Sequence, residues 1–382
     1  RLMLAYTGVQ PVGEGQPALQ AQCVAVGDGL DFTKAPGNPV VRLDGLDAGY
    51  SRTDFRDPKA WLDADGRYYL VVACRHQDRQ GAAMLFGSED GLRWRFLREL
   101  DSSRGQYGNM WECPDFFSLD GRQVLLLSIM GMQAAGEFHT GSCTAALIGR
   151  YDQEKGFVRQ AVQPVDLGLN FYAPQTTLAP DGRRIMMGWM DSWADSRKAP
   201  RRHAWYGRMS IPRELFLANG RLMQRPVHEM EALWQDTVVH RNVPILAEAS
   251  LPGVQGRCLD MTVTLHTADS ACRHFAMRLA KDAGHSVLIA WNAPAGILTF
   301  DRTQDGNDRD MAHTCCAQAA AHDGLLTLRL LLDQESVELF INDGERVLTC
   351  LTDAPRQAAG ITFSADQPIR MDVIAHPLDR QG

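Results

Sequence analysis

Short apolar runs separated by turn residues, rather than long amphipathic stretches, organise this chain. Residues 68–73, 123–128 and 184–189 are runs of this kind, and an Asp-Gly pair precedes each of them. Because Asp and Gly both tolerate a positive φ, Asp-Gly between apolar runs is a strong signal for a β-hairpin. Repeated hairpins predict an all-β protein, built as either a sandwich or a propeller.

The pattern changes near residues 228–245, where a short helical segment interrupts the hairpins. Beyond it the runs become longer and more regular, and residues 259–265 alternate cleanly between apolar and polar side chains. Residues 336–341 are followed by the turn Asn342-Asp343-Gly344. This half therefore predicts an antiparallel β-sandwich. Because 382 residues exceed one ordinary core, we expect two domains, residues 1–235 and 236–382.

Composition excludes several classes of protein. The formal net charge is −7 and no basic stripe is present, which argues against a nucleic-acid partner. No window approaches 18 uninterrupted apolar residues, so no membrane span is expected. The nine cysteines lack metal-ligand spacing, which predicts a reduced cytoplasmic protein without a metal. The sequence makes no prediction about the oligomeric state.

The first residues have the pattern of a strand already under way. Leu2, Leu4 and Tyr6 alternate with other residues, and no initiator Met precedes them. We interpret this start as a cut through the first domain, so that part of that domain and any signal peptide lie upstream.

Two carboxylates stand out by their neighbours. Asp57 lies in the segment Asp54-Phe55-Arg56-Asp57-Pro58, and Glu112 lies in Trp111-Glu112-Cys113-Pro114-Asp115. Proline fixes the backbone just past each acid, and an aromatic neighbour can desolvate a carboxyl so that it serves as a general acid. Taken singly, each segment is more often a turn with a solvated ion pair or the end of a strand.

Taken together, these segments resemble the Arg-Asp-Pro and Glu-Cys-Pro motifs of family 32 glycoside hydrolases, in the order that the family has them. Further segments resemble the same family across almost the whole chain: residues 170–175, 182–190, 205–207, 211–215, 222–227 and 336–344. The resemblance implies a five-bladed β-propeller, its first blade incomplete here, followed by a β-sandwich.

The resemblance also implies a retaining mechanism with two carboxylates, which are roughly 5–5.5 Å apart in such enzymes. Glu112 matches the acid/base, and Asp57 matches the acid that stabilises the transition state through fructose hydroxyls. Arg56 matches a residue that holds the substrate. No metal or organic cofactor is implied.

Further residues match the surroundings of this site. Trp111, Tyr172, Trp189 and Trp193 are predicted to bind substrate, although such rings also fill the space between blades. Cys113 and Asn170 are predicted to tune the protonation of the acid/base, as is Tyr172. For Cys113, a role as a small buried apolar residue is equally well supported.

Two departures from the family are visible. The family's nucleophile lies in an Asn-Asp-Pro motif, and no Asn-Asp-Pro occurs in the 382 residues, so the nucleophile is not present in this chain. Asn170 stands where the family usually has Asp, and it cannot supply the same charge near Glu112 or Arg56. Asp166 is a weaker candidate for that charge.

The predicted function is hydrolysis of the terminal β-D-fructofuranoside bond of sucrose 6-phosphate or sucrose, as in the invertase type of this family. The partner is thus a small sugar. A basic stretch at residues 197–203 would suit a phosphate, although a solvated loop explains it more simply. The alternatives are an exo-acting fructan β-fructosidase acting on inulin or levan, and a catalytically inactive relative that binds fructosides.

Overall fold

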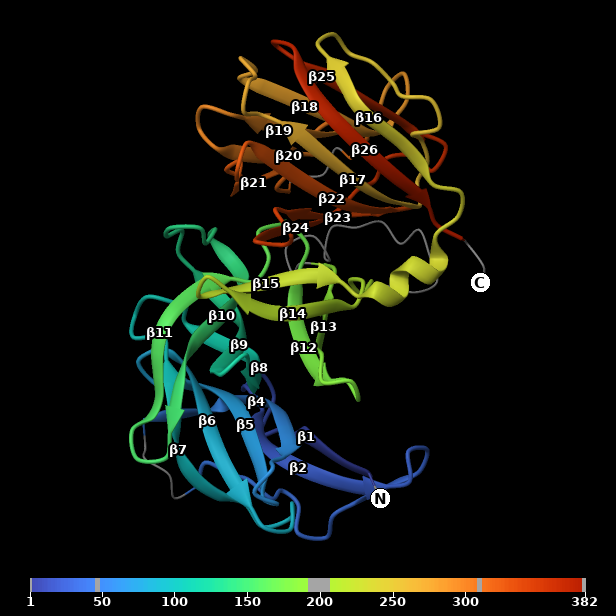
Figure 1. The fold of residues 1–382 in the computed structure, drawn as a ribbon. Coiled ribbons are helices and arrows are strands. Elements are labelled where there is room, and N and C mark those ends of the chain that lie inside the picture. The colour runs from blue at the N-terminus through green and yellow to red at the C-terminus, as the bar shows by residue number, and fades with distance from the viewer. Residues whose placement is uncertain (1, 45–48, 192–206, 308–310, 380–382) are drawn as a thin grey trace. The chain divides into compact units, whose positions relative to one another are not determined.

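The computed structural model describes residues 2–44, 49–191, 207–307 and 311–379. Within these ranges the regular structure is six β-sheets and one short 3₁₀ helix, η1 (His228–Leu233). The chain divides into two compact units, one of residues 1–164 and 173–176, the other of residues 165–172 and 177–382 (Figure 1). The prediction of an all-β protein is confirmed. The described residues contain no helix long and apolar enough to cross a membrane.

The first unit consists of three sheets whose strands follow the order of the sequence. The first sheet has three strands and the next two have four each: β1 (Leu2–Gln10), β2 (Leu19–Gly27) and β3 (Phe32–Lys34); β4 (Tyr50–Leu62), β5 (Tyr68–His76), β6 (Gly81–Ser88) and β7 (Arg95–Ser102); β8 (Met110–Leu119), β9 (Arg122–Met132), β10 (Gly141–Asp152) and β11 (Gly156–Pro164). Strand β4 contacts both β1 and β8, so the first strands of successive sheets lie side by side (Figure 1). This is how the blades of a propeller meet.

The three hairpins predicted from Asp-Gly pairs are present, and the turn at Asp120-Gly121 has the expected geometry. Strand β8 ends at Leu119 and β9 begins at Arg122, which leaves only Asp120 and Gly121 in the turn. Both residues have a positive φ, 46° and 75° respectively. A two-residue turn with this geometry matches the right-handed twist of the strands on either side.

Apolar side chains fill the space between the second and third sheets. Val71 and Leu85 from the second sheet and Leu125 and Leu127 from the third are almost completely buried in one cluster. Phe116 joins them and lies 6.3 Å from the ring of Trp61. The cores of the apolar runs at 68–73 and 123–128 are thus buried on both faces, whereas Met187 in the run at 184–189 is exposed.

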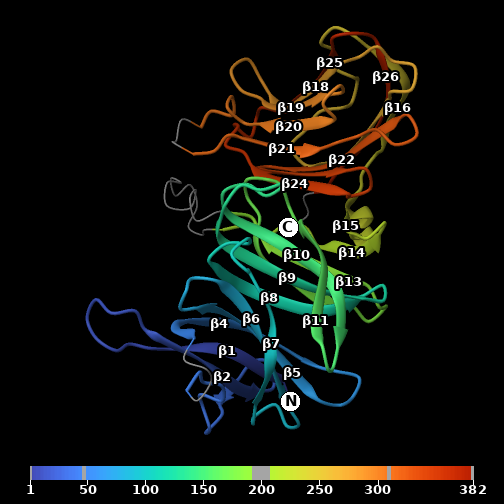
Figure 2. The ribbon, with the colours of Figure 1, turned by 90° about the vertical axis from the view of Figure 1, so that its left-hand side faces the viewer.

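The second unit carries a sandwich and a fourth sheet, except for residues 173–176 of the first strand of that sheet, which belong to the first unit. The fourth sheet comprises β12 (Tyr172–Leu178), β13 (Arg184–Trp189), β14 (Arg213–Ala218) and β15 (Arg221–Pro226), and η1 follows it. The sandwich has two sheets, one in the order β16 (Val238–Ile245), β26 (Ile369–Pro377), β17 (Leu259–His266), β22 (Leu325–Asp333), β23 (Ser336–Ile341) and β24 (Arg346–Leu351), the other in the order β21 (Thr314–Gln318), β20 (Ile297–Asp301), β19 (Val287–Asn292), β18 (His274–Lys281) and β25 (Gly360–Ala365) (Figure 2).

The sandwich core is formed by alternate residues of both sheets. Val263 and Leu328 from one sheet and Phe300 and Phe363 from the other are fully buried in it. The period-2 pattern of the sequence placed these side chains on one face. The predicted fold class, a propeller followed by a sandwich, is confirmed.

A buried cluster of charges joins the fourth sheet to the sandwich within the second unit. Arg213 is completely buried and forms ion pairs with Asp166 at 2.9 Å and with Glu338 at 2.5 Å. Its guanidinium carbon lies 4.5 Å from the centre of the Phe171 ring. The domain boundary predicted at residue 235 falls between η1 and β16, and this cluster contains residues from both sides of it. That boundary stays a prediction.

Candidate active site

The first strands of three four-stranded sheets, β4, β8 and β12, share one unusual backbone feature. Asp57 on β4, Cys113 on β8 and Ala173 on β12 have φ values of 59°, 48° and 51°, and each directly precedes a proline. A positive φ is uncommon for a residue other than glycine and costs about 1–3 kcal/mol. Such strain persists only where the surrounding structure enforces it, and it concentrates at active sites.

The same positions interrupt the strand pairing. The register of β4 with β5 shifts between Arg56 and Lys59, and that of β8 with β9 shifts between Glu112 and Asp115. A bulge of this kind turns side chains away from their regular directions and commonly lies beside an active site. The two candidate carboxylates therefore lie on equivalent irregularities of neighbouring strands.

The carboxylate of Asp57 is held by the adjacent strand. Its Oδ2 accepts a hydrogen bond of 3.0 Å from the backbone amide of Cys113, and the Cys113 Sγ lies 3.7 Å away. The backbone amide of Asp57 itself donates to Thr7 Oγ1 at 3.1 Å. Burial, assisted by the charge of Glu112, raises the pKa of Asp57 despite the opposing effects of the Cys113 amide and Arg56.

Arg56 bonds directly to the carboxylate of Glu112. Its Nε and Nη2 donate to the same oxygen of Glu112, Oε1, at 3.0 and 2.7 Å. Burial opposes the charge of Arg56, but hydrogen bonding to Glu112 and the charges around it raise its pKa. The Arg56 side chain is 20% exposed and the Glu112 carboxylate is 13% exposed, so both are shielded yet reachable.

The thiol of Cys113 completes this group as a neutral side chain. Burial, followed by the charges of Asp57 and Glu112, raises the pKa of the Cys113 thiol. A thiol kept protonated can donate weakly to Asp57 but is a poor nucleophile.

A second layer of contacts ties β4, β8 and β12 together directly beyond their prolines. The Asp115 Oδ2 accepts from the backbone amide of Thr176 at 2.7 Å and from its hydroxyl at 2.8 Å. Lys59 Nζ lies 3.3 Å from Asp115 and donates to the Thr176 carbonyl at 2.7 Å. Gln175 donates to the Cys113 carbonyl at 3.0 Å. We define Lys59, Asp115 and Thr176 as the inner clamp.

Sequence reasoning missed this layer, although a signal was present. Proline follows residues 57, 113 and 173, and the next residue is Lys59, Asp115 or Gln175. The repeated X-Pro step followed by a polar residue marks equivalent positions of three blades.

The structure corrects the prediction for Trp111. Its side chain is fully buried, belongs to the apolar cluster between the second and third sheets, and donates from Nε1 to the Tyr107 carbonyl at 2.8 Å. A fully buried ring cannot stack on a sugar, so Trp111 acts in packing rather than in binding substrate.

The other predicted residues lie in the second unit. Tyr172 is buried at 4% exposure, and Trp189 is partly exposed at the end of β13, where it forms a bridge with Met209. Asn170 is fully buried, and its Oδ1 accepts from Arg302 Nη1 and from the Leu351 amide, each at 3.0 Å. Their roles in binding or tuning stay predictions.

Three further sequence predictions remain. Asp166 forms an ion pair with Arg213 and accepts a hydrogen bond from the Thr349 hydroxyl, so its charge is compensated by these contacts. Trp193 and the basic stretch at 197–203 lie outside the described residues.

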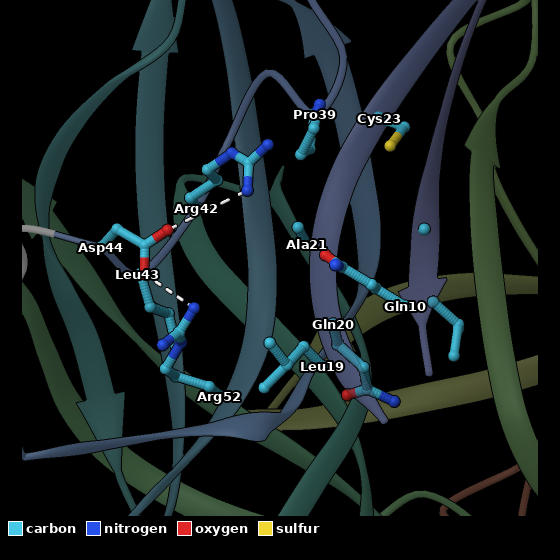
Figure 3. Close-up of a pocket in the computed structure, with 12 residues that line it drawn as sticks. Gln10, Leu19, Gln20, Ala21, Cys23, Pro39, Arg42, Leu43, Asp44 and Arg52 are labelled. Atoms are coloured by element: carbon cyan, nitrogen blue, oxygen red, sulfur yellow. Dashed lines mark ion pairs between the residues drawn. The ribbon is translucent and has the colours of Figure 1, made fainter. Parts of the chain in front are cut away.

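A pocket borders this site in the first unit. Gln20 lines it together with Arg42, Asp44 and Arg52, and the two arginines reach toward Asp44 at 4.0 and 2.9 Å (Figure 3). Gln20 also touches the site, because its Oε1 accepts from Arg56 Nη1 at 3.5 Å.

Comparison with known proteins gives a consistent result. The model of the glycosyl hydrolases family 32 N-terminal domain matches residues 1–226, and that of the family 32 C terminal matches residues 229–370. Raffinose invertase of Escherichia coli is 34% identical over 359 residues, covering 91% of this chain and 71% of the relative. Sucrose-6-phosphate hydrolase of Staphylococcus xylosus is 31% identical over 330 residues, covering 86% of this chain and 66% of the relative.

A solved structure agrees with these relatives. A family 32 β-fructofuranosidase of Bombyx mori has a TM-score of 0.82 at 26% identity, covering 99% of this chain and 76% of that one. The chain thus spans about two thirds to three quarters of the length of the proteins that it resembles.

Proposed function

Because this chain belongs to glycoside hydrolase family 32, we propose that it acts in hydrolysis of the terminal β-D-fructofuranoside bond of sucrose or sucrose 6-phosphate. The observation that carries the proposal is the pairing of Asp57 and Glu112 on equivalent bulges of β4 and β8, with Arg56 bonded to Glu112. The names of the related invertase and sucrose-6-phosphate hydrolase support the choice of substrate.

In this proposal Glu112 is the acid/base. It protonates the glycosidic oxygen as the bond to fructose breaks, and later removes a proton from the attacking water. Arg56 holds the Glu112 carboxylate in place between those steps. Arg56 also donates from Nη1 to Asp54 Oδ1 at 3.2 Å, and this second bond fixes the orientation of the guanidinium.

Asp57 stabilises the oxocarbenium-like transition state in this proposal. A desolvated carboxylate accepts hydrogen bonds from sugar hydroxyls strongly, and these strengthen as positive charge develops on the ring. The Cys113 amide fixes the direction of the carboxylate. The nucleophile is left unassigned, since the 382 residues contain no Asn-Asp-Pro motif.

We also propose a cytoplasmic location, because all nine cysteines are free thiols, as is usual in a reducing compartment. Tyr172, Trp189 and Trp193 are proposed as sugar contacts, with Cys113 and Asn170 as neighbours that tune the site.

The test is release of fructose from sucrose 6-phosphate, sucrose, inulin and levan by the complete protein, with the 382-residue chain assayed beside it. Preference for either sucrose substrate supports the proposal. Faster release from inulin or levan would instead indicate a fructan β-fructosidase. Binding of fructosides by the complete protein without any release would indicate an inactive relative.

Activity of the 382-residue chain alone carries separate information. Clear turnover by that chain would mean that another of its carboxylates attacks the sugar, and the roles of Asp57 and Glu112 would then need to be reassigned.

A further inference from the structure

Asp54 lies between two arginines beside the proposed active site. Its Oδ1 is 3.2 Å from Arg56 Nη1, and its Oδ2 pairs closely with Arg75 Nη2. The Ser51 hydroxyl donates to the same Oδ2 at 2.9 Å. Burial works against the Asp54 charge, but these hydrogen bonds and the Arg75 charge lower its pKa, so Asp54 is a carboxylate at neutral pH.

These contacts form a row of alternating charges, Arg75, Asp54, Arg56 and Glu112. All four side chains are largely shielded, with exposures of 29%, 18%, 20% and 13% respectively. In such surroundings a charge acts on its neighbours more strongly than at a water-exposed surface. Arg56 therefore interacts with both Asp54 and Glu112. The negative charge of Asp54 weakens the effect of Arg56 on Glu112, and the positive charge of Arg75 partly cancels that of Asp54.

Other groups face this row from several strands. Gln20 from β2 accepts from Arg56 and is uncharged. The charge of Asp57 on β4 acts on Arg56, and Cys113 on β8 contacts Asp57. On the sheet that contains β4, Lys59 pairs with Asp115, while Tyr50, His76 and Glu99 contact one another. Because His76 and Glu99 pair with one another at 2.8 Å, a His76 variant serves as a separate control.

We propose that Asp54 and Arg75 are positioning residues that set the pH range over which Glu112 can act as the acid. They hold the Arg56 guanidinium against Glu112 and adjust the net positive charge beside it. This inference rests on the proposed function for its meaning in catalysis, while the coupling of charges can be measured without turnover.

The experiment compares Asp54→Asn with Arg75→Gln in the complete protein. Asp54→Asn removes a negative charge from the row, so the alkaline limb of kcat/KM for sucrose should shift to lower pH by about one unit. Arg75→Gln removes a positive charge, so the limb should shift to higher pH. Arg75→Lys keeps the charge and should restore most of the original profile.

Opposite shifts separate this role from simple damage to the fold. A variant that merely loosens the structure lowers kcat at every pH and leaves the limbs in place. Asp90→Asn is the matched control, since Asp90 pairs with the highly exposed Arg93 in the same unit. His76→Gln separates any contribution of the imidazole to the same limb.

A second measurement keeps the inference testable if turnover is absent. Carboxyl ¹³C NMR follows the titration midpoint of Glu112 directly in each variant. Midpoints that move in opposite directions while the wild type hydrolyses no fructoside would support the charge coupling and reject the proposed function. Unmoved midpoints in an active enzyme would overturn the inference and leave the proposed function intact.

Discussion

The carboxylate of Asp57 accepts a 3.0 Å hydrogen bond from the backbone amide of Cys113, the residue that follows Glu112 in sequence. One contact between β4 and β8 thus fixes both proposed catalytic carboxylates relative to each other. Both residues of this contact have a positive φ and lie at a register shift of their strand. The two carboxylates are therefore positioned by the bulges of β4 and β8 rather than by regular strand geometry.

The Asp57 carboxylate should reduce stability while serving function. Its folded-state pKa is raised by burial above the usual value of 3.8, so the ionised form costs stability at neutral pH. Asp57→Asn keeps an acceptor for Cys113 and tolerates a positive φ. We expect the variant to lose fructoside hydrolysis while its Tm at pH 7 rises by about 2 °C.

The pH dependence of that gain follows from the direction of the shift. As pH falls through the raised pKa of Asp57 and then below 3.8, the wild-type carboxyl becomes protonated and the penalty disappears. Calorimetry at pH 7 and at pH values near 3.8 should show the two melting temperatures converging. A lower Tm for the variant at pH 7 would contradict the argument.

Glu112→Gln tests the acid role. A glutamine cannot protonate the leaving oxygen, so sucrose hydrolysis by the complete protein should fall about 10²–10⁴-fold. Fructosides with a nitrophenol leaving group need little protonation and should be affected far less. Steady-state kinetics on both substrate types make the comparison, and equal losses would remove Glu112 from this role.

The inner clamp should contribute strongly to stability. Asp115 is 2% exposed and receives the Thr176 amide, the Thr176 hydroxyl and the Lys59 ammonium. Asp115→Asn removes the charge from a buried acceptor of three donors, while its cation Lys59 is 29% exposed, so the free energy of unfolding should fall by roughly 2 kcal/mol. Urea denaturation measures this, with Asp63→Asn, a change at an exposed aspartate of the same unit, expected to alter the free energy of unfolding little. Equal stability of the two variants would refute a structural role for the clamp.

Backbone strain at Ala173 predicts an unusual order of substitutions. Its φ of 51° precedes Pro174, and glycine adopts this conformation without strain, so Ala173→Gly should be neutral or stabilising by up to about 1 kcal/mol. Ala173→Val should be destabilising by more than about 2 kcal/mol, because a branched side chain fits a positive φ poorly. Thermal melts of the pair provide the measurement, and the reverse order would exclude strain at this position.

Asn170→Asp tests the departure from the family's usual residue. The Asn170 Oδ1 accepts from Arg302 and from the Leu351 amide, and an aspartate would keep both bonds and pair with the arginine. We expect unchanged or slightly higher stability, measured by urea denaturation. A marked loss of stability would show that the buried site does not accept a charge despite Arg302.

Local chemistry allowed much of the fold to be predicted. Asp120 and Gly121 specify a two-residue turn by their tolerance of positive φ, and alternation at Leu259–His266 specifies which side chains enter the sandwich core. The candidate acids Asp57 and Glu112 drew attention by their proline and aromatic neighbours, but their roles came from the resemblance of several ordered segments to one family.

The errors arose where local meaning was ambiguous. Trp111 has the same aromatic character whether it faces a sugar or the space between two sheets. Its position in the core depends on tertiary packing, in which the indole lies directly against Gly81, a residue without a side chain. The roles of Lys59 and Asp115 were missed because the repeated X-Pro step marks equivalent positions of the strands but does not show which of their side chains pair.

The sequence by itself thus determined the strands, the turns and the identity of the two candidate carboxylates, because these depend on neighbours within a few residues. Only the tertiary structure decided that Arg56 bridges to Glu112, that Asp54 and Arg75 extend this row, and that Asp115 anchors Thr176. Those contacts join residues 21 to 61 positions apart, and their geometry follows from how the sheets pack rather than from any local preference.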